Sequence, residues 1–165
     1  MGVIRMKKHF VISAAALIAT LDASAAVPKK VNAFEGGERL VYTRVVEAYR
    51  KSDLNGVVQN RNLLEKNYPN SVHLDNAYYL TGMLEFQNNR IGEAVRSFGT
   101  VRSRFPLSNK RPAALFGLAM SYHKLGLQPI ATNIMNEILR EYPGSPESQR
   151  AWTQLQIDKK GSLKR

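Results

Sequence analysis

Three pairs of an aromatic residue followed by proline recur along this chain at one fixed interval. Pro69, Pro106 and Pro143 stand 37 residues apart, and each is followed two residues later by a serine. Because proline lacks an amide hydrogen and clashes with the preceding turn, each pair is expected to end a helix. A serine hydroxyl accepts a hydrogen bond from an unpaired amide where a helix begins. The sequence therefore predicts a helical hairpin that repeats every 37 residues.

Two further series of small or β-branched residues keep the same interval. They are Val57, Ala94 and Ala131, and Ala77, Ala114 and Ala151. Small residues suit the points where two packed helices cross, because a larger side chain there would overfill the contact. We expect the closest crossings at Ala94 and Ala131.

The helix signals predict seven helices in the second part of the chain. Their expected bounds are 38–50, 53–67, 75–88, 91–104, 112–125, 129–142 and 146–159. Asp53 is the expected cap of the second helix, and Gly126 is the expected end of the fifth. The fold class is therefore all-α, with about three helical hairpins and a C-terminal capping helix over residues 38–160. A basic tail, 161–165, follows.

The seventh helix has no partner of its own in the sequence. Terminal helices of repeat arrays cover the last exposed apolar face. Trp152 falls on the 37-residue period of Tyr78 and Leu115. We therefore expect Trp152 to pack onto the last hairpin.

The repeat resembles a known family. Tyr78, Gly82, Ala94, Phe98 and Pro106 have the spacing of the tetratricopeptide repeat, whose common period is about 34 residues. The second copy consists of Leu115, Leu118, Ala119, Tyr122, Gly126, Ala131 and Pro143, and a degenerate first copy consists of Val41, Val45, Val57, Leu64 and Pro69. The three extra residues are expected between the proline and the next helix.

The aromatic-Pro-x-Ser hinge is similar to that of the C-terminal domain of the periplasmic cell-division coordinator CpoB (YbgF), and more distantly to the repeats of BamD. That resemblance implies a non-enzymatic scaffold whose partner belongs to the Tol-Pal or peptidoglycan-synthesis machinery. CpoB-like proteins also carry an N-terminal coiled coil for self-association. Residues 26–37 are too short for such a segment, so the oligomeric state stays open.

The first residues have the layout of a secretory signal peptide. Basic residues lie within 5–8, an apolar run covers 10–21, and Ala23-Ser24-Ala25 supplies small residues for cleavage. We predict a signal peptide over 1–25, a linker over 26–37 and a periplasmic location; an uncleaved anchor is the alternative. The chain has no cysteine, so lipid attachment of the bacterial lipoprotein type is not expected.

No catalytic or metal-binding constellation is apparent, and neither an enzyme nor a cofactor is expected. His9, His73 and His123 are far apart in sequence, and no nucleophile elbow or glycine-rich phosphate loop occurs. Glu85 stands where this repeat usually carries an aromatic residue. Pairing with an arginine, a local shift of the helix face and a catalytic carboxylate are the three interpretations.

A candidate binding groove follows from the first helix of each hairpin, which lines the concave side of tetratricopeptide arrays. Three series of apolar, aromatic or histidine residues repeat there every 37 residues, and members of one copy share one helix face. They are Tyr42, Tyr79 and Phe116; Val46, Met83 and Met120; and Tyr49, Phe86 and His123. Such a groove suits a partner helix or an extended peptide. The alternative is a groove filled by residues 26–37.

The chain is strongly basic, with a formal net charge of +11. Five basic residues form a candidate surface around the middle hairpin: Arg96, Arg102, Arg104, Lys110 and Arg111. A positive surface attracts anionic partners. The second function class is therefore a structural subunit of an envelope assembly that binds a membrane, a glycan or an acidic protein. Nucleic acid is not an expected partner of an exported protein, and a merely solvated basic face is the simpler alternative.

Overall fold

The computed structural model describes residues 33–162, with side chains from 36 to 161, and all of them lie in one compact unit, Val31–Arg165. The predicted signal peptide, most of the linker and the last three residues lie outside the described residues. Seven helices and no strand occur within 33–162. They are α1 (Ala33–Arg50), α2 (Leu54–Asn67), α3 (Leu74–Gln87), α4 (Ile91–Arg104), α5 (Arg111–Lys124), α6 (Gln128–Glu141) and α7 (Pro146–Ser162).

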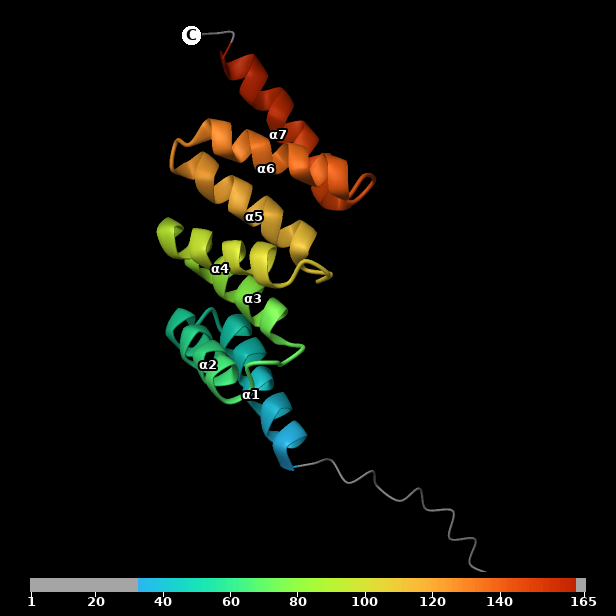
Figure 1. Cartoon of the computed structure of the whole chain (residues 1–165). Helices are drawn as coiled ribbons and strands as arrows, with labels where there is room; N and C mark the ends of the chain where they lie inside the picture. The colour runs from blue at the N-terminus through green and yellow to red at the C-terminus, as the bar shows by residue number, and fades with distance from the viewer. Residues whose placement is uncertain (1–32, 163–165) are drawn as a thin grey trace, which may run out of the picture. The chain divides into compact units, whose positions relative to one another are not determined.

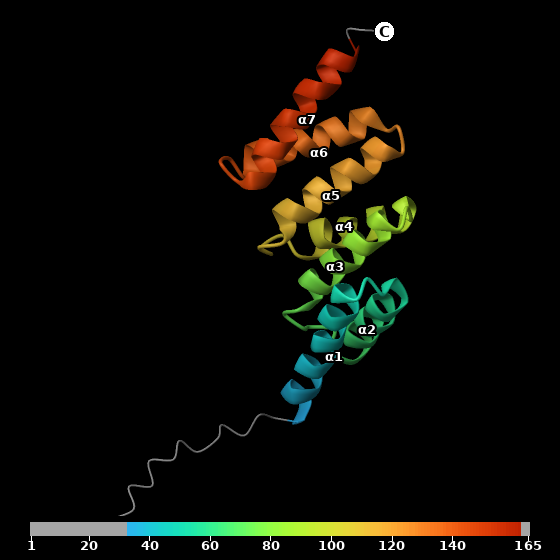
Figure 2. The ribbon, with the colours of Figure 1, turned by 180° about the vertical axis from the view of Figure 1, so that it is seen from behind.

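The helices form three consecutive hairpins and an unpaired last helix. The hairpins α1–α2, α3–α4 and α5–α6 follow one another in chain order, and α7 packs against α6 (Figure 1, Figure 2). The odd-numbered helices also contact each other in sequence, α1 with α3, α3 with α5 and α5 with α7. Among the described residues, the backbones of the even-numbered helices do not approach one another closely, although side chains of α4 form ion pairs with α2 and α6. The expected all-α hairpin array is confirmed.

The hairpin turns use a left-handed residue at one repeat position. Ser52, Asn89 and Gly126 have φ values of 55°, 61° and 76° and stand 37 residues apart. After the left-handed residue, the amide of Arg90 donates to the carbonyl of Glu85 over 2.8 Å, which closes the end of α3. Gly126 occupies its left-handed position without the steric cost that a side chain brings. The predicted helix end at this glycine is confirmed.

The hinges between hairpins explain the long period. Ser71 accepts a hydrogen bond from the amide of His73, and Ser108 accepts one from the amide of Lys110. The helices α3 and α5 begin only after these amides. The extra residues therefore lie between the proline and the next helix, as expected, but these two serines brace the hinge and do not cap a helix.

Two predicted caps are confirmed at the helix starts. Asp53 accepts a hydrogen bond of 2.9 Å from the amide of Gly56 in α2. Ser145, which directly precedes α7, accepts one of 3.0 Å from the amide of Ser148. Each cap satisfies an amide that has no partner within the helix.

The middle of the core is built around Phe98. A Cβ atom added to Gly82 of α3 or Gly117 of α5 would lie 2.8 Å or 2.6 Å from the Phe98 ring. The ring therefore fills the space that these two glycines leave, and a side chain at either position would collide with it. Ala94 and Ala131 are fully buried, as expected for helix crossings.

The ends of the array differ from the expectation. The first helix begins at Ala33, so part of the predicted linker is helical, and α7 continues to Ser162. Trp152 is 57% exposed, so the prediction that it packs onto the last hairpin was wrong. Tyr78 and Leu115 at the same repeat position are buried. They belong to helices that have a hairpin partner, whereas α7 has none within the described residues.

None of the helices between residues 33 and 162 combines the length and apolar character that a membrane crossing requires.

Candidate functional site

The predicted groove residues lie together on the odd-numbered helices. Their side chains are partly buried, and seven of the nine pack against the core cluster. The seven are Tyr42, Tyr49, Tyr79, Met83, Phe86, Phe116 and Met120. Because α1, α3 and α5 contact each other, these side chains occupy one layer and not three separate sites. The layer therefore presents a half-exposed apolar surface, and its role in binding stays a prediction.

Tyr79 is the best-defined member of this surface. Its ring lies 6.2 Å from that of Phe98, tilted by 50°, so one side of Tyr79 belongs to the core. Burial raises the pKa of Tyr79, and the nearby Tyr49 and Glu147 raise it further. Glu147 belongs to α7, which contacts α5 of the same layer.

At both ends of the layer, groove residues contact other side chains of the same chain. Tyr42 stacks on His73 with ring centroids 4.2 Å apart, and it accepts a hydrogen bond from Asn76. His123 lies 3.0 Å from a carboxylate oxygen of Asp158 in α7. The ammonium group of Lys124 lies 5.2 Å from the centre of the Phe86 ring. The middle of the layer is therefore less occupied by polar partners than its two ends.

The predicted basic surface is largely an internal ion-pair network. Arg102 and Arg111 approach the carboxylate of Glu137 to 2.6 Å and 3.1 Å, and Arg111 also reaches Glu141. Arg104 pairs with Glu65. The Arg111 side chain is only 14% exposed and is engaged with two carboxylates, so its part in binding an external anion stays a prediction. The cause of this engagement is tertiary, because its partners Glu137 and Glu141 lie 26 and 30 residues later in the sequence, on α6.

The remaining members of that set are less engaged. Arg96 is 73% exposed and lies 3.8 Å from Glu93, the longest of the ion pairs. Lys110 lines a shallow hollow of about 500 Å³ together with Tyr42 and His73. Isolated surface ion pairs contribute little to stability. Arg96 is therefore the member most available to an external anion.

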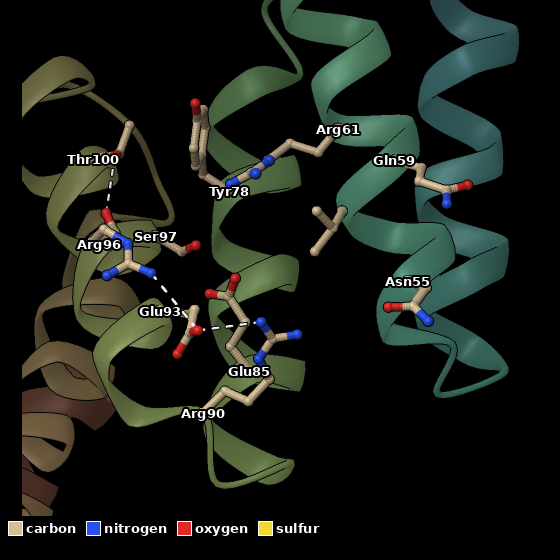
Figure 3. A pocket seen from close by; sticks show the side chains of 11 residues that line it. Asn55, Gln59, Arg61, Tyr78, Glu85, Arg90, Glu93, Arg96, Ser97 and Thr100 are labelled. Carbon is tan, nitrogen blue, oxygen red and sulfur yellow. Dashed lines mark hydrogen bonds and ion pairs between the residues drawn. The ribbon is translucent and has the colours of Figure 1, made fainter.

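A second hollow lies between α2 and α4, beside one face of α3 (Figure 3). We call it the α2–α4 hollow; it has a volume of about 530 Å³. Arg61 enters from α2, Tyr78 and Glu85 from α3, and Ser97 from α4. Arg90, Glu93 and Arg96 lie on the α4 side, with Glu93 between the two arginines.

Glu85 is the unusual residue of this hollow. Its side chain is 5% exposed, and its Oε2 atom has no hydrogen-bond partner among the described residues. Burial raises the pKa of Glu85 above the ordinary carboxyl value, although a hydrogen bond from Ser97 and the charges of Arg61 and Arg90 oppose the change. Buried polar atoms without partners are rare and costly. Pairing of Glu85 with an arginine was one of three interpretations, and no such hydrogen bond occurs among the described residues.

Arg61 carries the second unpaired buried atom. Its Nε has no hydrogen-bond partner among the described residues, and its guanidinium lies 4.6 Å from the centre of the Tyr78 ring. The Tyr78 hydroxyl donates a hydrogen bond of 2.6 Å to Glu65, also in α2. At this distance the positive guanidinium is attracted by the face of the ring. The α2–α4 hollow therefore contains one unpaired acidic oxygen and one unpaired basic nitrogen.

The sequence contained a signal for Arg61 that was not used. Arg61 stands one period before Phe98 and two periods before Met135, both of which are fully buried. A charged residue at a repeat position that is otherwise apolar indicates a changed environment. Glu85 was recognised in this way, but Arg61 was not, because the first repeat copy is degenerate.

The described residues contain no group of three or more histidine, cysteine, aspartate or glutamate side chains that could hold a metal ion. This concerns the part of the chain from 33 to 162 only. The two histidines in that part, His73 and His123, are engaged with Tyr42 and Asp158.

Comparison with known families agrees with the fold. Residues 113–145 match the family model of the tetratricopeptide repeat. That range contains most of α5 and all of α6 and ends at the hinge before α7. A search of curated proteins found no match to the chain. The hairpin array is thus of the tetratricopeptide type, a fold that generally mediates contacts between proteins.

Proposed function

We propose that this chain is an exported, non-enzymatic scaffold that binds a partner protein or peptide on the layer of odd-numbered helices. The observation that carries the proposal is the periodic apolar surface of Tyr79, Met83, Phe116 and Met120, which is neither fully buried nor interrupted by ion pairs. Aromatic and methionine side chains in such a groove provide apolar contact that adapts to a partner.

The proposed location of this activity is supported by the sequence alone. The signal-peptide pattern over 1–25 supports export to the periplasm without a lipid anchor. The resemblance to CpoB supports a partner in the Tol-Pal or peptidoglycan-synthesis machinery, and so a role in cell-envelope or cell-division organisation. Peptide sequencing of the mature protein tests export directly. We expect a first residue of Ala26 in the osmotic-shock fraction, and an intact N-terminus in the membrane fraction would contradict it.

Site-specific photo-crosslinking tests the groove itself. A photoreactive phenylalanine analogue replaces Met83 or Met120, and a control carries it at the exposed Asn133 on α6. We expect one crosslinked partner from both groove positions and none from the control. Crosslinks to the same partner from Asn133 alone would place binding elsewhere.

Alanine substitution is a weaker test than crosslinking here. Tyr79 contacts Phe98, so its truncation changes the core as well as the surface. Any loss of binding in such a variant must therefore be compared with its loss of thermal stability. A charge at Met83, Met83→Glu, disturbs the apolar surface while leaving the Phe98 contacts of Tyr79 in place.

A further inference from the structure

The α2–α4 hollow lies on a different side of α3 from the groove residues. Tyr78 and Glu85 face the hollow, whereas Tyr79, Met83 and Phe86 belong to the groove set. The hollow therefore needs its own explanation, independent of partner binding in the groove.

The chemistry of the two unpaired atoms restricts what could occupy this hollow. The Arg61 Nε carries a hydrogen and requires an acceptor. The Glu85 Oε2 requires a donor if the carboxylate is ionised, and becomes able to donate if the group is protonated. Burial favours the protonated form of Glu85, because an isolated charge is poorly solvated there. In that form both unpaired atoms donate, and a ligand with two acceptor oxygens satisfies both.

The surrounding charges favour an anion over a cation. The charged groups that face Glu85 are Arg61 from α2, and Arg90 and Glu93 from the start of α4, with Arg96 further along α4. From its own helix only Tyr78 lines the same hollow, and α1 and α5 contribute no lining residue. With Glu85 protonated, three arginines face one carboxylate, Glu93, which Arg90 and Arg96 already share. A cation would meet an excess of like charge.

We propose that the α2–α4 hollow binds a small oxyanion, a carboxylate or a phosphate group, which accepts hydrogen bonds from Arg61 and from protonated Glu85. The proton on Glu85 comes from solvent and is taken up with the anion. Arg61 and Glu85 line the same hollow from α2 and α3 (Figure 3), so one ligand in the hollow lies near both side chains. Arg90 and Arg96 contribute the positive field at the α4 side.

Nuclear magnetic resonance of the ¹⁵N-labelled chain tests this site directly. Sodium acetate and sodium phosphate are titrated separately at constant ionic strength, with sodium chloride as the reference, and the Arg61 Nε–H signal is followed. We expect a saturable shift with one of the two anions and none with chloride. The anion with the higher affinity identifies the source as a carboxylate or a phosphate. No saturable shift with either anion would overturn the proposal.

Proton uptake provides the second readout. The titration is repeated at about pH 5.5 and about pH 7.5, where one linked proton changes affinity by up to about tenfold per pH unit. We expect weaker binding at the higher pH. Glu85→Gln keeps a donor without a titrating proton, so it should bind with little pH dependence. Equal affinities of the wild type at both pH values would contradict the role of Glu85.

Matched variants separate the site from the general positive charge. Arg61→Met introduces the residue that the third hairpin carries at Met135. Because this variant has no Arg61 signal, the backbone amide of Ser97, which also lines the hollow, is followed instead. The substitution should abolish the shift of the Ser97 amide on addition of the anion. Arg140→Met removes an exposed arginine of α6 outside the hollow and should leave the response unchanged. If both variants weaken binding equally, the anion binds to net charge and not to this hollow.

Discussion

Two spaces at equivalent positions of consecutive repeats have opposite chemistry. One is the polar α2–α4 hollow beside α3, and the other is the apolar, packed space between α4 and α6 beside α5. Beside α3, between α2 and α4, the repeat positions hold Arg61, Tyr78, Glu85 and Ser97. One period later, on α4, α5 and α6, the same positions hold Phe98, Leu115, Tyr122 and Ile134. The second set packs: Phe98, Leu115 and Ile134 are at most 3% exposed. The first set leaves a hollow of about 530 Å³ with two unpaired polar atoms.

This difference teaches that the backbone repeat does not depend on identical packing in every copy. The hairpin turns close in the same way at Ser52, Asn89 and Gly126, although the side chains beside them differ. Local hydrogen bonds define the repeat, and apolar burial elsewhere supplies the stability that the polar hollow lacks. A buried unpaired group costs stability and persists more readily where it has a use.

The largest effect is expected from breaking the apolar space. Phe98→Ala removes the ring that fills the gap left by Gly82 and Gly117, and should lower the free energy of unfolding by about 3–5 kcal/mol. Chemical denaturation measures the change, with the half-exposed Val95→Ala as the control. A loss no larger than that of the control would show that Phe98 is not central to the core.

A second expected effect tests the helix crossing of the next hairpin, α5–α6. Ala131 is fully buried, so Ala131→Leu overfills the contact between α5 and α6 and should cost about 1–3 kcal/mol. Asn133→Leu adds the same side chain at an exposed position of α6 and is the control. Equal melting temperatures of the two variants would mean that the crossing tolerates a larger residue.

The polar hollow can be converted into its apolar counterpart. The double variant Arg61→Met, Glu85→Tyr introduces residues that later repeats carry at these positions. Removing two unpaired buried polar atoms should raise the free energy of unfolding by about 1–3 kcal/mol. Each single variant is the control, because one leaves Glu85 and the other leaves Arg61 in place. A destabilised double variant would indicate that the hollow differs in shape from the apolar space of the following repeat, so that the new side chains do not fit.

The smallest expected effect is on the pH dependence of stability. Because the pKa of Glu85 is raised by burial, the folded chain holds this proton at pH values where the unfolded chain has lost it. Stability from this group is therefore greatest below the ordinary carboxyl pKa and decreases as pH rises through the folded value. Glu85→Gln should remove that decrease. Melting temperatures measured across mildly acidic pH report this decrease. The same pH dependence in the wild type and in Glu85→Gln would contradict the raised pKa.

The carboxylates of the ion-pair network give the opposite sign. Burial opposes ionisation of Glu65, but hydrogen bonds from Tyr78 and Arg104 lower its pKa overall. Glu141 also has a lowered pKa, chiefly because Arg111 donates to it. Their contributions are present above the ordinary carboxyl pKa and decrease as pH falls through the folded values. Comparing the wild type with the Glu85→Gln variant isolates the effect of Glu85, because Glu65 and Glu141 are present in both proteins.

The expected hairpins, the cap at Asp53 and the turn at Gly126 were predictable from the sequence, as were the buried alanines. Each depends on residues that are close in the chain or on a repeated interval. The groove residues were identified as one periodic set, and the structure brings them into one layer, but their binding role stays a prediction. The exposure of Trp152 and the ion pairs of Arg111 were not predictable, because each depends on which helix lies opposite.

The sequence by itself determined the period, the helices and the residues where hairpins turn, because proline, serine and glycine act on their own backbone and its nearest neighbours. Only the tertiary structure decided that Arg111 would join Glu137 and Glu141, and that Arg61 and Glu85 would share a hollow without pairing. Those outcomes depend on distances between side chains from different helices. Charge and burial act through space, so their consequences appear only once the helices are packed.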